Sequence, residues 1–131
     1  MTSRSNRDVP LDIKKRTFLF AVRIVQLVGR LPRTVAGIEI GRQLIRAGTS
    51  VGSNVEEADG AISRKDFVNH TRIARKEARE SRFWLTLIEA ANLFLDPEVA
   101  ALIQEADELA RILSKIANTA SLGKKPMATS Q

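Results

Sequence analysis

Apolar residues recur every three or four positions along most of this chain, which is the spacing of helices that bury one face. Runs that alternate apolar and polar residues between turn residues, typical of strands, are absent. Only four prolines and seven glycines occur, and most of them stand at the joints between the periodic segments. The pattern therefore predicts an all-α protein with four helices.

Proline and glycine set the limits of the first two helices. The first helix is predicted to start after Pro10 and to run to about Leu31, because Pro32 cannot continue a helix. The second is predicted to start at residue 35 or 38 and to end near residue 58, just before a glycine.

Capping residues mark the other two helices. Ser63 stands three residues before Asp66, a near capping box, and predicts a third helix that continues to about Phe94. The run Asp96-Pro97-Glu98 places an N-cap, a first-turn proline and an acid at the start of a fourth helix, which ends near residue 120. We expect residues 10–120 to form one antiparallel up-down-up-down bundle, between a flexible basic N-terminus (1–9) and a flexible C-terminal tail (121–131).

The first helix carries two apolar lines, one of which includes Phe18 and Val25. A helix that is apolar nearly all round is usually buried on two sides. Either the four helices enclose it completely, or one line packs against another subunit, because large exposed apolar patches are uncommon on monomers. We assign the second line and a tryptophan of the third helix to a subunit interface: Phe20, Ile24, Leu27 and Trp84.

The second helix combines small and polar residues. Gly41, Gly48 and Gly52 lie on one face, and each costs about 1 kcal/mol relative to Ala in a helix interior, so a close approach of another helix is expected there. Arg46 is the expected partner of Glu77, since burying an unpaired carboxylate costs several kcal/mol. We predict a polar network that fixes helix register: Gln43, Arg46, Asn54, Glu57, Glu77 and Glu80.

Six cations fall within an arc of about 120° on the third helix. This basic stripe comprises Lys65, Arg72, Arg75, Lys76, Arg79 and Arg82. Such a stripe is suited to the phosphates of RNA or DNA. It is also typical of a solvated face, or of a surface matched to the acidic fourth helix of this or a neighbouring subunit.

The amino-acid composition excludes several kinds of functional site. The 131 residues include no cysteine and one histidine, which excludes disulfides, thiolate metal sites and a cysteine nucleophile. We expect no enzymatic activity, no cofactor and no metal. No apolar run approaches the ~20 residues of a membrane span, and no signal peptide precedes the first helix, so we expect a cytoplasmic protein without a membrane partner.

The net charge of +6 is unevenly distributed. Residues 1–33 carry eight basic and two acidic groups and residues 64–82 carry seven and three, whereas residues 83–113 carry one and six. The local charge of the third helix, rather than the total, is what favours a nucleic-acid partner.

Three linked runs resemble a known family: residues 43–58 (QLIRAGTSVGSNVEEA), 63–67 (SRKDF) and 73–85 (IARKEARESRFWL). In this order and spacing they are similar to the bacterial four-helix-bundle family named after the protein encoded in 23S rRNA intervening sequences. The resemblance covers residues 11–118.

The resemblance implies a bundle that assembles as a barrel-like homo-oligomer, a homopentamer. Members are similar to the accessory protein of diversity-generating retroelements, which associates with nucleic acid and a reverse transcriptase, and the family has no associated catalytic activity. The expected function is therefore a basic accessory protein that contacts RNA or DNA, the alternative being a protein–protein interaction scaffold without nucleic-acid binding.

Overall fold

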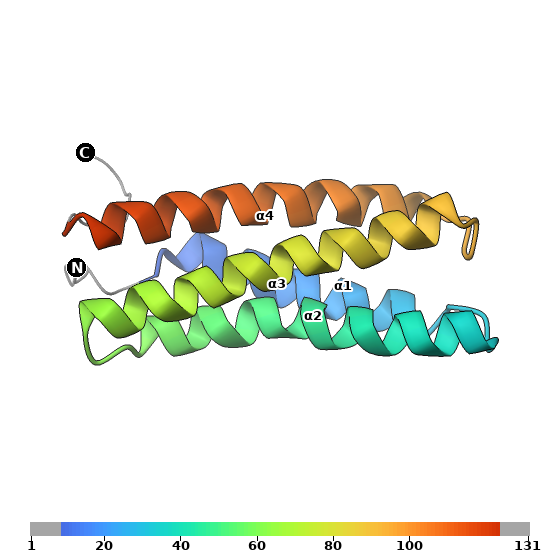
Figure 1. The fold of residues 1–131 in the computed structure, drawn as a ribbon, viewed down its shortest axis with the longest axis horizontal. Coiled ribbons are helices and arrows are strands. Elements are labelled where there is room, and N and C mark those ends of the chain that lie inside the picture. The colour runs from blue at the N-terminus through green and yellow to red at the C-terminus, as the bar shows by residue number, and fades with distance from the viewer. Residues whose placement is uncertain (1–8, 124–131) are drawn as a thin grey trace.

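The computed structural model describes residues 9–123, which form four α-helices and no strand (Figure 1). The helices are α1 (Leu11–Val28), α2 (Val35–Asp59), α3 (Arg64–Ala90) and α4 (Pro97–Ser121). The predicted all-α class and the number of helices are confirmed.

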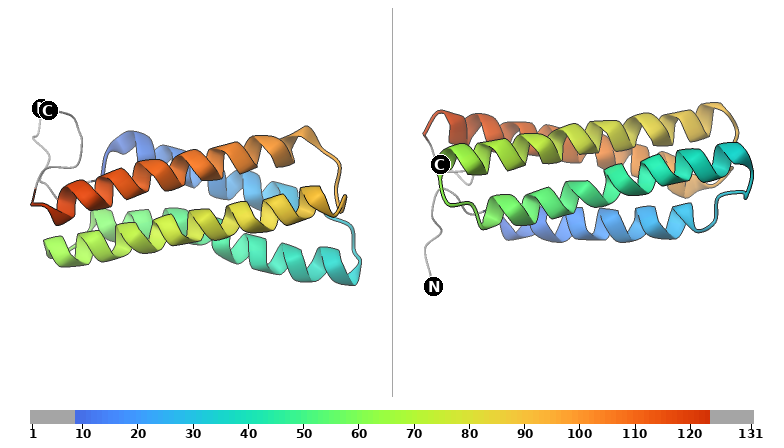
Figure 2. Two further views of the ribbon diagram at one scale, coloured as in Figure 1. Left: turned by 45° about the horizontal axis from the view of Figure 1, so that its top comes forward. Right: turned by 60° about the horizontal axis from the view of Figure 1, so that its bottom comes forward.

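Each helix runs back alongside the one before it, and α1 and α4 close the ring (Figures 1 and 2). The contacts between α2 and α3 agree with this, because later residues of α2 meet earlier residues of α3. On α2, Arg46 pairs with Glu80 of α3, whereas Asn54, two turns further on, contacts the earlier residue His70. The packing of α3 on α4 and on α2 is the most extensive, so α3 lies at the centre of the contacts.

The predicted caps of the last two helices are confirmed. The side-chain oxygen of Ser63 accepts a hydrogen bond from the backbone N–H of Asp66 at 3.0 Å. The Asp96 carboxylate accepts one from the N–H of Glu98 at 2.8 Å. Both bonds satisfy amides that a helix leaves unpaired at its first turn, which is why these local signals were readable in the sequence.

Two helices end earlier than predicted. The third helix stops at Ala90 instead of Phe94, because Asn92 adopts a left-handed backbone with φ of 53°. The N–H of Leu93 then bonds to the carbonyl of Ile88 at 3.0 Å, which closes the helix. Asparagine tolerates this conformation better than most residues.

The first helix stops at Val28 instead of Leu31. The chain that follows turns back over the start of α2, where Thr34 caps the helix by accepting from the N–H of Gly37 at 3.1 Å. A β-carbon at Gly37 would lie 1.9 Å from the carbonyl oxygen of Pro32. The turn can pack this closely only on a glycine.

The core runs the length of the bundle and draws on all four helices. Two expectations from the sequence are wrong. Phe20, Ile24 and Leu27 are fully buried inside the bundle and cannot form a subunit interface. Val9, assigned to the flexible N-terminus, is 2% exposed and donates its N–H to Asp59 at 2.9 Å. Residues 1–8 and 124–131 of the two expected flexible ends lie outside the described residues.

The expected close helix approach is confirmed between α1 and α2. A β-carbon at Gly48 would lie 2.8 Å from Ile24, and one at Gly52 would lie 3.2 Å from the backbone oxygen of Thr17. Gly41 lies similarly close to Val28. The three glycines let α1 approach the backbone of α2 closely, which compensates for their low helix propensity.

Within residues 9–123, none of the helices has the length and apolarity that a membrane crossing needs.

Candidate nucleic-acid interface

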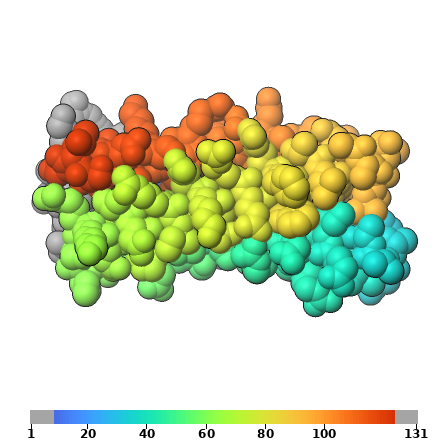
Figure 3. Space-filling view, in the orientation of Figure 1, coloured from blue at the N-terminus to red at the C-terminus, as the bar shows by residue number. Residues whose placement is uncertain are grey.

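Four cations of the predicted basic stripe form a row along the outer face of α3. We call Lys65, Arg72, Lys76 and Arg79 the outer row, and all four side chains are exposed. In Figure 3, α3 lies in front, between α4 and α2. Lys65, Arg72 and Arg79 form no ion pair within the described part of the chain. The row is therefore open to an external anion.

The other two cations of the stripe turn toward α4. The Nη1 of Arg75 donates to the hydroxyl of Ser114 at 3.3 Å, and its side chain is half-buried. Arg82 donates to the Asp107 carboxylate at 2.9 Å. The stripe predicted from the sequence thus divides into an outer row of four and a pair that joins α3 to α4.

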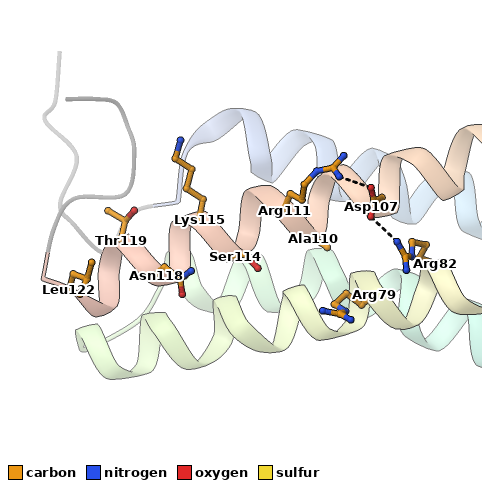
Figure 4. Close-up of a pocket in the computed structure, with 10 residues that line it drawn as sticks. All are labelled: Arg79, Arg82, Asp107, Ala110, Arg111, Ser114, Lys115, Asn118, Thr119 and Leu122. Carbon is orange, nitrogen blue, oxygen red and sulfur yellow. Dashed lines mark hydrogen bonds and ion pairs between the residues drawn. The ribbon is translucent and has the colours of Figure 1, made fainter.

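A hollow of about 640 Å³ lies over α3 and α4 (Figure 4). In this hollow the Asp107 carboxylate lies between Arg82 and Arg111. One of its oxygens contacts Arg82, and the other is 2.8 Å from Arg111. Lys115 also lines the hollow and points away from α3 in Figure 4. Arg111 and Lys115 were missed at the sequence level. An acid and a base four residues apart, Asp107 and Arg111, were the available signal.

A second hollow of about 760 Å³ lies at the start of α3, and Arg64, Lys65 and Arg72 line it. The outer row therefore passes from one hollow toward the other along the same helix. Asp66 is the acidic residue in this second hollow, and it contacts the ring of His70 at 3.3 Å. Basic side chains outnumber acidic ones in both hollows.

Three glutamates of α4, Glu98, Glu105 and Glu108, face α1. Arg16 lies 2.8 Å from Glu105 and 3.0 Å from Glu108. Arg23 makes a two-point contact with Glu98, whose shorter distance is 2.8 Å. These two arginines are seven residues apart, so they lie on the same face of α1.

A third arginine, Arg30, lies in the turn just after α1, continues the series and lies 2.9 Å from Asp96. The regular spacing at positions 16, 23 and 30 was the signal in the sequence for this arginine ladder. Every acidic residue of α4 is thereby paired inside the described chain, since Asp107 is held by Arg82 and Arg111.

The pKa shifts agree with this pairing. The hydrogen bond from Arg23 holds the pKa of Glu98 below its ordinary value. The pKa of Asp96 is lowered by the backbone N–H of Glu98 and then by Arg30. On the other side, the hydrogen bond to Glu105 raises the pKa of Arg16. These groups all carry their charge at neutral pH.

Part of the predicted polar network is present between α2 and α3. Arg46 lies 3.6 Å from the buried carboxylate of Glu77, as expected, and also pairs with Glu80. The indole N–H of Trp84 donates to Glu80 at 3.2 Å. Burial opposes ionisation of Glu80, but the hydrogen bonds from Trp84 and Arg46 outweigh it and lower its pKa. Trp84, assigned to a subunit interface, is half-buried and tied to this cluster.

The remaining members of that network lie apart from Arg46. Asn54 donates to the carbonyl of Ser50 at 2.9 Å, which turns its side-chain oxygen toward Nδ1 of His70 at 3.2 Å. Glu57 is exposed and Gln43 is half-buried, and neither has a side-chain hydrogen bond within residues 9–123. The sequence spacing placed these residues on one line, but the contacts divide them.

Nothing in the described residues gathers three or more metal-ligating side chains at one place. The one histidine contacts Asn54 and Asp66. The exposed cations of the outer row are groups that can bind anions.

Comparison with known proteins agrees with the fold. The model of the 23S rRNA-intervening sequence proteins matches residues 10–115, most of the chain. The chain belongs to this family. The predicted family membership is confirmed.

A solved structure supports the same assignment. A protein of unknown function from the S23 ribosomal protein family of Bacteroides thetaiotaomicron is 34% identical to this 23S rRNA-intervening sequence family member, with a TM-score of 0.73. The match covers 82% of this chain and 96% of the other. Among curated proteins, none matches this family member.

Proposed function

We propose that this protein is a non-enzymatic, homo-oligomeric nucleic-acid-binding protein that serves as a cytoplasmic accessory to a nucleic-acid-processing complex, for example one that contains a reverse transcriptase. One observation carries the nucleic-acid part. The outer row has no acidic partner of its own for Lys65, Arg72 and Arg79 among the described residues, while the acids of α4 are all engaged.

Exposed cations in a row attract a polyanion because each phosphate contact releases condensed counterions. The row contains only lysine and arginine, which contact phosphates regardless of base sequence. The expected interaction is therefore strong in low salt and indifferent to sequence.

The alternative is a scaffold in which the basic stripe packs on the acidic α4 of a neighbouring subunit. That arrangement needs free carboxylates on α4. Glu98, Glu105 and Glu108 are instead paired with arginines of their own chain. The pairing supports nucleic acid over a neighbouring α4 as the partner of the outer row.

The two carboxylates beside Arg46 favour a non-enzymatic protein. A general acid at neutral pH needs a raised pKa. Glu80 has a lowered pKa, because Trp84 and Arg46 stabilise its charged form against the cost of burial. Arg46 also balances the charge of the buried Glu77.

The outer face of α1 supports assembly. Leu11, Phe18 and Val25 are 56%, 70% and 47% exposed and are spaced seven residues apart, so they form an apolar stripe. This α1 stripe is a candidate contact with a second copy, in place of the buried line of Phe20, Ile24 and Leu27. The homopentamer and its barrel form are proposed from the family resemblance.

The experiment for nucleic-acid binding is a fluorescence anisotropy titration of labelled RNA and DNA at several salt concentrations. The triple variant Lys65→Ala, Arg72→Ala and Arg79→Ala should bind at least about tenfold more weakly in low salt and show a shallower dependence on salt. Arg75 is left intact because its loss would disturb packing on α4.

A matched control changes the same kind of charge elsewhere. Lys15, Arg33 and Arg42 are exposed outside the outer row, and the triple variant Lys15→Ala, Arg33→Ala and Arg42→Ala should bind within about twofold of the wild type. If the wild type shows no salt-sensitive binding in low salt, the proposal is wrong. An equal loss in the control would show that total charge, rather than the outer row, determines binding.

A further inference from the structure

We infer that the outer row binds duplex nucleic acid in preference to single strands, an inference that rests on the proposed function. The observation behind it is the geometry of the row together with the aromatic residues that the surface lacks.

The row is straight. Its members stand at positions 65, 72, 76 and 79 of one uninterrupted helix, so they span about 21 Å along its axis. At 100° per residue they stay within an arc of about 60°. A straight and rigid line of charge is complementary to a polyanion that is itself straight over this distance.

A duplex also offers a denser charge. It carries one phosphate charge per ~1.7 Å of axis, against one per ~3.4 Å for a single strand. The same four cations therefore face a polyanion with about twice the charge per unit length when the ligand is a duplex.

Single-strand binders compensate for their lower charge by stacking bases on aromatic side chains. On this face of α3 the one exposed aromatic residue within residues 9–123 is Phe83, which is 58% exposed and packs edge-on against Trp84 at 5.0 Å. It follows the last member of the outer row by four residues, so it lies at one end of the row. The four cations have no aromatic residue between them on the surface.

The row also lies along the exposed face of α3, where Lys65, Arg72 and Arg79 border the two hollows. A flexible single strand would have to be ordered along this face without stacking to stabilise it, and ordering a flexible chain costs free energy. A duplex is already ordered, so it avoids this cost.

The test compares a labelled duplex of about 20 base pairs, longer than the row, with one of its strands alone. Both DNA and RNA duplexes are used, since their phosphates offer the same chemistry. We expect the duplex to bind at least about tenfold more tightly in low salt. The slope of log K against log salt should be near −3.6 for the duplex, four contacts at about 0.9 each.

A variant separates the two modes of binding. Phe83→Ala should change duplex affinity by less than about twofold, because Phe83 does not contact phosphates. If bases stack on this surface, the same variant should weaken single-strand binding about tenfold.

The outcomes are distinct. Tighter duplex binding that is insensitive to Phe83→Ala supports the inference. Single-strand binding as tight as duplex binding, or tighter, overturns it while leaving the proposed function intact. Absence of binding to every probe in low salt overturns the proposed function as well.

Discussion

The side chain of Ile24 on α1 occupies the space above Gly48 on α2 that a β-carbon would need, with both of its γ-carbons 2.8 Å from that position. Ile24 is fully buried in the core between the helices. This pair sets how closely the two helices approach.

Gly48→Ala should therefore destabilise the bundle by about 1–2 kcal/mol, because the strain of overpacking exceeds the gain in helix propensity. Urea unfolding followed by circular dichroism measures the change. In an Ile24→Ala background the same substitution should no longer be destabilising, since the obstructing γ-carbons are gone. The control is Gly60→Ala, where the nearest atom is 3.9 Å away. An equal loss in the control would contradict the explanation.

The contact between Arg23 and Glu98 should make stability depend on pH. Because the pKa of Glu98 is lower in the folded than in the unfolded protein, its contribution is present above the unfolded value, near 4.5, and is lost as pH falls through the folded value. Glu98→Gln should reduce the melting temperature at pH 7 and flatten its fall in acid.

The expected loss at neutral pH is about 0.5–1 kcal/mol, since both side chains are partly exposed. Thermal unfolding followed at several pH values measures it. Glu39→Gln is the control, because Glu39 is well exposed and lies 4.0 Å from Arg42. If both variants lose stability equally, the contact with Arg23 is not the cause.

Arg46 should be needed to keep Glu77 buried. Arg46→Ala leaves that carboxylate without its cation and should cost about 2 kcal/mol, less than a fully buried pair because Arg46 is half-exposed. Adding Glu77→Gln should recover part of this loss by removing the unpaired charge. Chemical unfolding of the single and double variants checks the result. Arg42→Ala, on the exposed side of α2, should change stability by less than about 0.5 kcal/mol.

The α1 stripe should control assembly. Phe18→Ser should lower the mass measured by light scattering at a fixed protein concentration, while helix content stays unchanged, because Phe18 is 70% exposed and outside the core. Ile62→Ser is the control, since Ile62 is 87% exposed in the turn before α3. A wild type that is monomeric, or a Phe18 variant with unchanged mass, would rule out this interface.

Local signals in the sequence were sufficient for the four helices and their capped starts. Ser63 and Asp96 each act on amides of the next turn, so their effect does not depend on the rest of the fold. The end of α3 was harder, because a single residue, Asn92, turns the backbone there and most asparagines do not.

Which apolar line of α1 faces the core was not readable from the pattern. Both lines are apolar, so hydrophobicity alone does not distinguish Phe18 from Phe20. In the observed orientation Phe20 points inward and Phe18 outward, Ile24 packs on Gly48 of α2, and Arg16 and Arg23 reach the carboxylates of α4. Which face of α1 is buried therefore depends on contacts with helices that are distant in the sequence.

In the candidate site too, some features follow from the local sequence and others from contacts between helices. The exposed positions of Lys65, Arg72, Lys76 and Arg79 follow from helix geometry and were predicted as a stripe. Their difference from Arg82 depends on Asp107, which α4 brings into reach. Charge alone could not distinguish a cation that joins two helices from one that is open to a ligand.

The arginine ladder limits changes in the length of α1. One residue inserted between Arg16 and Arg23 would rotate everything after it by about 100°, moving Arg23 and Arg30 off their carboxylates and Ile24 out of its place beside Gly48. A substitution at one rung removes a single pair and leaves the others aligned. Related proteins should therefore differ in the residues of this helix much more readily than in its length.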